Sequence, residues 1–214
     1  MKKTLFFLFM IFQTVFIACG NIGGVQDNES PGTEEVKGLG SHTIAHNASK
    51  DEDDNKKEAE WVVISDFCTP LLDKSKPRIH NIALVAEILD GLVISPNESF
   101  SFNETVGERS SEKGYKEAPI MIPSSEKPVT SYDYGGGVCQ VSGTLYNAVK
   151  KAGLKITERH PHSRKVPYLD KGMDATVDYG RFDLKFINTL KHPVRIAIAI
   201  EKDTLTVSVS TRKN

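Results

Sequence analysis

Residues 135–153 read GGGVCQVSGTLYNAVKKAG, so three glycines lead into a cysteine and then into a helical pattern. The stretch predicts a helix that starts near Cys139 and buries one face, with Gly153 as a C-terminal cap. Apolar side chains recur on that face at helical spacing, at Val141, Leu145, Ala148, Val149 and Ala152.

The segments before the glycines mix strand and helix patterns. Trp61–Phe67 is rich in Val and Ile, which favours a strand. Asn81 precedes an apolar-periodic run that stops before Gly91, and this run predicts a helix. Short extended pieces are expected after it, at residues 92–94, 100–102 and 120–122.

Strand patterns follow the central helix to the end of the chain. The last two, Val194–Glu201 and Thr204–Ser210, alternate around a turn at Asp203 and predict a hairpin. We therefore expect an α+β fold in which a mostly antiparallel sheet packs on the central helix that starts at Cys139. The other predicted strands are residues 155–159, 165–168, 175–179 and 183–188.

The N-terminus has the pattern of an exported protein. Lys2 and Lys3 precede an apolar stretch that is too short to span a membrane and that ends at Cys19. Because residues 16–19 resemble a bacterial lipobox, we predict a lipoprotein-type signal peptide over residues 1–19. Lipidation of Cys19 would anchor the protein to a membrane on its extracytoplasmic face. The alternative is an ordinary secretory signal cut nearby, which leaves Cys19 unlipidated or removes it.

Composition divides the rest of the chain in two. Residues 21–60 carry ten acidic side chains, four lysines and almost no large apolar residues, so we interpret residues 20–59 as a disordered acidic tether. Residues 60–214 have the size of one ordinary domain. The formal net charge of −1 indicates no nucleic-acid partner. No cofactor or metal site is expected, since His42 and His46 lack further ligands.

Residue types in the domain fit a cysteine enzyme. A helix N-terminus stabilises a thiolate, which makes Cys139 a candidate nucleophile. Such chemistry also needs a base and a group that orients the base. His162 is the preferred base and His160 the second choice, and either Asp174 or Asp183 would receive the other imidazole nitrogen.

This cysteine site has an enzymatic and several simpler interpretations. Gln140, together with N–H groups at the helix start, would stabilise an oxyanion. The order of cysteine, histidine and aspartate resembles that of papain-like and transglutaminase-like enzymes. Alternatively, Cys139 is a small buried core residue, and the glycines form only a tight turn or an anion cradle. A disulfide between Cys68 and Cys139 would block nucleophilic chemistry.

Two runs of residues follow a known family pattern in order and spacing. They are Asn81, Ile82, Ser99–Asn103, Val106, Gly107, Arg109, Gly114, Tyr115, Ala118 and Pro119, and then Gly135–Gln140, Leu145–Asn147, Ala152–Leu154, Glu158, Arg159, His162, Ser163, Asp174–Thr176, Asp183–Phe186 and Asn188. In these runs the domain resembles the VanW family, from about Trp61 onward. The resemblance implies a cell-envelope protein whose substrate class is peptidoglycan or its peptide stems. Cys68 departs from the pattern, in which a small residue is expected.

Two functions of different classes follow from these observations. The first is a cysteine-dependent acyl-transfer enzyme, a hydrolase or transpeptidase, with Cys139 as nucleophile and His162 as base and then acid. The second is a noncatalytic module that binds cell-wall material. In that module the contacts to carboxylates or sugars would come from Arg109, Gly135, Gly136 and Gly137. A weaker third hypothesis is a redox or structural role through Cys68 and Cys139.

Overall fold

The computed structural model describes residues 60–122 and 129–212, without the side chains of residues 121, 122, 129 and 130. The predicted signal peptide, its lipidation site Cys19 and the predicted tether lie outside the described residues. Within the two described ranges, no helix is both long and apolar enough to cross a membrane.

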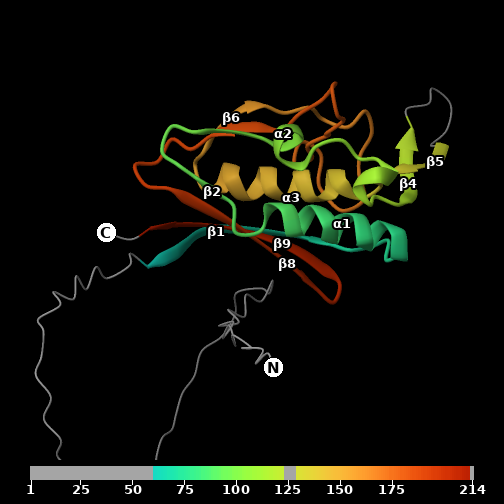
Figure 1. The fold of residues 1–214 in the computed structure, drawn as a ribbon, viewed down its shortest axis with the longest axis horizontal. Coiled ribbons are helices and arrows are strands. Elements are labelled where there is room, and N and C mark those ends of the chain that lie inside the picture. The colour runs from blue at the N-terminus through green and yellow to red at the C-terminus, as the bar shows by residue number, and fades with distance from the viewer. Residues whose placement is uncertain (1–59, 123–128, 213–214) are drawn as a thin grey trace, which may run out of the picture. The chain divides into compact units, whose positions relative to one another are not determined.

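A four-stranded antiparallel sheet forms one layer of the domain (Figure 1). Its two C-terminal strands form the predicted hairpin, and alternate side chains of the last strand are fully buried, as expected for a strand with one face on the core. The order across the sheet is β1 (Trp61–Pro70), β9 (Thr204–Arg212), β8 (Val194–Glu201) and β2 (Val93–Ile94).

Two helices, α1 (Lys76–Leu89) and α3 (Val138–Lys151), lie side by side on one face of this sheet (Figure 1). Helix α3 packs on β1 and β9, whereas α1 packs on β8 and on α3. Eleven of the fourteen residues of α3 are buried, so α3 is the central helix that the sequence predicts. It begins at Val138, and Cys139 is its second residue.

Helix α1 begins at Lys76, earlier than the start near Asn81 that the sequence indicates. Pro77 lies in the first turn, where its missing N–H breaks no helical hydrogen bond. Asn81 is fully buried, and its Nδ2 donates to the carbonyls of Lys116 (2.9 Å) and Gly136 (3.1 Å). Asn81 therefore holds the glycine loop against α1 instead of capping a helix.

A second layer covers the other side of α3 (Figure 1). It contains a three-stranded antiparallel sheet and a short helix, α2 (Phe102–Val106). A separate hairpin and a 3-10 turn, η1 (Ser111–Lys113), complete the described fold. The sheet has the order β3 (Ser99–Ser101), β7 (Lys185–Ile187) and β6 (Lys155–Glu158), and the hairpin consists of β4 (Glu117–Ile122) and β5 (Val129–Tyr134). The predicted α+β class and antiparallel pairing are confirmed.

The connection between β6 and β7 corrects two predicted strands. Residues 165–168 form no strand, and residues 175–179 contribute only isolated bridges. In residues 175–179, Ala175 and Val177 are buried because this part of the connection lies against α3, where Ser142 Oγ donates to the Ala175 carbonyl at 2.6 Å. Packing on a helix, rather than sheet pairing, thus produces the alternation. This connection carries His162 and Asp174 to the start of α3.

Candidate active site

A cleft of about 890 Å³ lies at the N-terminal end of α3. Its walls include the glycine loop, the start of the helix and the connection between β6 and β7. Cys139 lines it, and so do His162 and Tyr168. The cleft therefore brings the candidate nucleophile and candidate base to one surface.

Cys139 is a free, partly exposed thiol. Burial would raise the pKa of this thiol, but the hydrogen bond and positive charge of His162 outweigh it, and the charge of Arg109 also favours the thiolate. The pKa of Cys139 consequently lies below the ordinary cysteine value. In its neutral form the thiol donates weakly to the Val177 carbonyl, 3.5 Å from Sγ. The free thiol also means that the Cys68–Cys139 disulfide is not formed.

His162 connects the thiol to a buried carboxylate. Its Nδ1 lies 2.8 Å from Asp174 Oδ2, and its backbone N–H donates to the same oxygen at 2.5 Å. Burial would lower the pKa of His162, but its interactions with Cys139 and Asp174 raise it above the ordinary histidine value. A lowered thiol pKa beside a raised imidazole pKa favours a thiolate–imidazolium pair.

Asp174 is fixed from two sides. Arg159 Nη2 donates to Asp174 Oδ1 at 2.9 Å, and Arg159 Nε donates to the Asp174 carbonyl at 2.6 Å. Burial would raise the pKa of Asp174, but the hydrogen bonds from His162 keep it below the ordinary value. Asp174 is therefore an ionised acceptor that holds the His162 ring in one orientation.

Asp183, the other candidate partner of the histidine, lies elsewhere. Its carboxylate accepts from Ser101 Oγ at 2.6 Å, and from the backbone N–H groups of Asn103 (2.9 Å) and Leu184 (2.8 Å). These bonds join β3, α2 and β7 in the second layer. Of the two aspartates, only Asp174 contacts His162.

We expect an Asp183→Asn variant to lose about 1.5–3 kcal/mol of unfolding free energy, because it gives up hydrogen bonds to a charged acceptor. The pH dependence of Cys139 alkylation should stay at its wild-type position. Urea unfolding and alkylation profiles, measured on the same preparation, check both parts. A shifted alkylation profile in the folded variant would contradict the structural role of Asp183.

Gln140 does not present its side chain as an oxyanion donor. Its Nε2 donates to the Pro70 carbonyl (2.9 Å) and to Thr69 Oγ1 (3.1 Å), and its Oε1 accepts from Arg78 Nη2 (2.9 Å). The residue is 1% exposed. Both ends of this amide join α3 to β1 and α1.

The glycine loop makes room for two arginine stems. A Cβ on Gly135 would come within 2.8 Å of the Arg109 side chain, and one on Gly137 would come within 3.0 Å of Arg78 Cγ. A Cβ on Gly136 would meet the backbone of β4 at 2.7 Å. The loop is glycine-rich because these neighbours approach it closely.

Three residues of this site are not among the functional residues that the sequence suggests. Arg159 orients Asp174, as described above. Arg78 and Tyr168 line the cleft, with the Arg78 guanidinium 5.9 Å from the Tyr168 ring centre. Burial and the negative charge at Cys139 raise the pKa of Tyr168, so its phenol stays protonated.

His160, the second choice of base in the sequence, pairs with Glu158, with 3.0 Å between His160 Nε2 and Glu158 Oε1.

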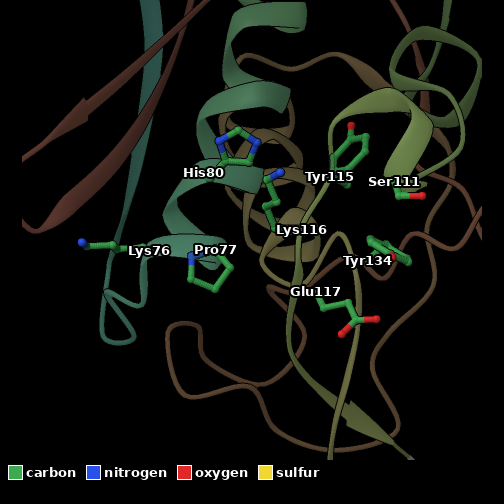
Figure 2. Close-up of a pocket in the computed structure, with 8 residues that line it drawn as sticks. All are labelled: Lys76, Pro77, His80, Ser111, Tyr115, Lys116, Glu117 and Tyr134. Carbon is green, nitrogen blue, oxygen red and sulfur yellow. The ribbon is translucent and has the colours of Figure 1, made fainter.

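A second, shallower depression of about 660 Å³ adjoins the cleft. Figure 2 shows its side chains arranged between α1 and the base of the β4–β5 hairpin. It holds no cysteine, but Tyr134 lines both hollows, so the depression continues the cleft past that ring. Its lining residues are Lys76, Pro77, His80, Ser111, Tyr115, Lys116, Glu117 and Tyr134.

Comparison with known proteins identifies the domain. The family described as VanW like protein matches residues 77–210, which include all but the first residue of α1, most of the residues that line the cleft and most of the C-terminal hairpin. The chain belongs to the VanW family. Within this VanW-family domain, the match contains Cys139, His162 and Asp174.

Two curated relatives are similar over the same length. Uncharacterized protein YoaR of Bacillus subtilis (strain 168) is 47% identical over 133 residues, which are 62% of this chain and 43% of the relative. Vancomycin B-type resistance protein VanW of Enterococcus faecalis (strain ATCC 700802 / V583) is 31% identical over 133 residues, 60% of this chain and 47% of the relative. The similarity thus spans less than half of each relative. No solved structure matches the chain significantly.

Proposed function

We propose that this VanW-family domain is a cysteine-dependent acyl-transfer enzyme, a hydrolase or a transpeptidase. The observation that carries the proposal is the chain of contacts from the Cys139 thiol through His162 to Asp174. A base held by a buried carboxylate beside a thiol of lowered pKa is the arrangement that cysteine nucleophiles require. The papain-like order of these three residues supports the reaction class by analogy only.

The proposed reaction begins with attack of the Cys139 thiolate on the carbonyl carbon of a peptide or isopeptide bond. A C–S bond forms and the carbonyl electrons move to oxygen. Among the described residues the N–H of Cys139 has no hydrogen-bond acceptor, so it and the Tyr168 phenol are our candidate oxyanion donors. When the oxyanion collapses, the C–N bond breaks and the His162 imidazolium gives its proton to the leaving amine.

The second half of the reaction resolves the thioester. Water in a hydrolase, or an amine in a transpeptidase, loses a proton to His162 and attacks the thioester carbonyl. The thiolate leaves, and the starting thiolate–imidazolium pair is restored. Asp174 keeps the imidazole in the tautomer that this exchange needs.

The proposed substrates are the peptide stems of peptidoglycan. One relative is named a vancomycin B-type resistance protein, and vancomycin acts on the cell envelope, which supports a role there for this domain. We further propose that the protein is exported and held at a membrane by a lipid on Cys19, with residues 20–59 as the tether.

The test is capture of the acyl-enzyme. The protein is incubated with peptides released from peptidoglycan, quenched in acid and weighed by mass spectrometry. We expect a mass increase on Cys139 that hydroxylamine removes, as it does for a thioester. A Cys139→Ser variant should form no such thioester. His160→Ala, a control near the site, should retain the adduct. Failure of a folded, thiol-reactive wild type to form any adduct or product contradicts the enzyme proposal.

The second candidate is a noncatalytic module that binds cell-wall material. The size of the cleft and the arginines beside the glycine loop favour it. A Cys139→Ala variant separates the two, because a binding module retains full function without the thiol. Sedimentation with purified peptidoglycan measures that binding.

A further inference from the structure

Arg78 and Arg109 flank the glycine loop that leads into Cys139. The Arg78 stem packs against Gly137 and the Arg109 stem against Gly135. Both arginines line the cleft. The two positive charges therefore lie on either side of the loop that presents the nucleophile.

Each guanidinium is held in place by one amide oxygen. Arg109 Nη1 donates to Asn103 Oδ1 at 2.8 Å, and Arg78 Nη2 donates to Gln140 Oε1 at 2.9 Å. The Arg109 guanidinium also lies 5.5 Å from the centre of the Phe102 ring. These contacts fix the direction of each group before any ligand arrives, which lowers the entropy cost of binding.

Each guanidinium also has a buried nitrogen that is left without a partner. Among the described residues, Arg109 Nη2 and Arg78 Nε have no hydrogen-bond acceptor. Neither arginine forms an ion pair within the described part of the chain. A buried donor without an acceptor costs stability, and both arginines line the cleft, so an acceptor supplied from outside the chain would offset this cost.

We propose that Arg78 and Arg109 form a carboxylate-binding subsite, so that the substrate is a peptide with a free carboxylate close to the bond that Cys139 attacks. The position of the carboxylate relative to that bond rests on the proposed function, whereas binding of the carboxylate does not. The subsite defines the substrate class as stem peptides with a free carboxylate and selects against their amidated forms.

The surroundings favour a carboxylate over a phosphate or a general anion field. Four carboxylate side chains line the same cleft, so its overall charge does not attract anions. Selection must then come from short hydrogen bonds to the two fixed guanidinium groups, and a planar singly charged acceptor suits them. The four carboxylates are Asp73, Glu108, Asp133 and Asp178.

Calorimetric titration of the full chain carrying Cys139→Ala tests the subsite without turnover. The probes are a synthetic stem tetrapeptide with free carboxylates and the same peptide with its carboxyl groups amidated. A hydrogen bond to a charged group contributes about 1.5–3 kcal/mol, so we expect the free form to bind roughly 10-fold to 100-fold more tightly. Arg78→Gln and Arg109→Gln should each remove most of that preference.

Arg181→Gln is the matched control, because Arg181 lines the same cleft but is exposed and paired with Asp178 at 3.3 Å. It should keep the preference. If a glutamine variant does not fold, the corresponding lysine variant, which retains the stem against the glycine, replaces it. Equal affinities for the two peptides, no binding of the free form, or an unchanged preference in both arginine variants would each overturn the subsite.

The outcomes separate the subsite from the proposed function. If the protein prefers the free carboxylate but forms no acyl-enzyme, the proposed subsite stands and the proposed enzymatic function is rejected. If an acyl-enzyme forms equally fast from free and amidated peptides, the proposed subsite is rejected and the proposed enzymatic function stands.

Discussion

A His162→Ala variant is expected to lose the low-pH reactivity of Cys139. In the wild type the hydrogen bond and charge of His162 overcome burial and hold the pKa of the thiol below its ordinary value. Without His162, burial becomes the main influence and raises the pKa of the thiol above that value. Below both pKa values, each unit of increase lowers the thiolate fraction about tenfold, so alkylation at pH 6 should slow by about tenfold or more.

The measurement is the rate of iodoacetamide modification of Cys139 between pH 4 and 9, followed on the peptide that contains this residue. His160→Ala is the control, because His160 lies two residues away and pairs with Glu158. Its profile should match that of the wild type. A wild-type thiol that titrates at or above the ordinary cysteine pKa, or a His162→Ala profile that does not move, would rule out the thiolate–imidazolium pair.

An Asp174→Asn variant is expected to lose most acyl transfer while keeping the thiol and the histidine. Asp174 Oδ2 accepts from both the ring and the backbone of His162, and an asparagine offers an amide N–H that stabilises the wrong imidazole tautomer. In serine triads the same substitution lowers kcat by about 10⁴, so we expect a loss of roughly 10²–10⁴ in the rate of acyl-enzyme formation.

The variant also has a pH signature. The carboxylate helps to raise the pKa of His162, so its neutralisation should lower the pKa of His162 and thereby raise that of Cys139. Asp170→Asn is the control, since Asp170 lies on the same connection but is highly exposed. Thermal unfolding is measured in parallel, and rates are corrected for the folded fraction. An Asp174→Asn protein that is folded and as active as the control would show that Asp174 is not the orienting group.

Residue chemistry and chain order were enough to propose the cysteine and the histidine. Cys139 follows a glycine run at the start of a strongly periodic helix, and this local pattern is visible without any tertiary contact. The choice between Asp174 and Asp183 was not visible in the same way. Both aspartates lie in strand-like surroundings in the sequence, and only packing shows that one meets the histidine while the other joins three elements of the second layer.

The strand predicted at residues 175–179 is absent for a physical reason. Residues 175–179 alternate apolar and polar side chains, which is typical of strands, but the alternation reflects contact with α3. A sequence pattern reports which side chains are buried and does not report the element that buries them. For the same reason, the sequence does not identify Arg159 as a partner of Asp174.

The sequence of the glycine loop also leaves its role open. A run of three glycines next to a helix start is compatible with a turn, an anion cradle or a nucleophile loop. The structure adds that two of these glycines accommodate the stems of Arg78 and Arg109. Those arginines come from α1 and from the segment after α2, so their convergence on the loop is a property of the fold.

The sequence by itself determined the α+β class, the C-terminal hairpin and the membership of the VanW family, because each depends on local periodicity or on residues in a fixed order. The tertiary structure alone decided that Asp174 holds His162, that Gln140 is structural and that two arginines face the cleft. These contacts join residues far apart in the chain, and only the packing of the connection and of α1 against α3 brings them within hydrogen-bonding distance.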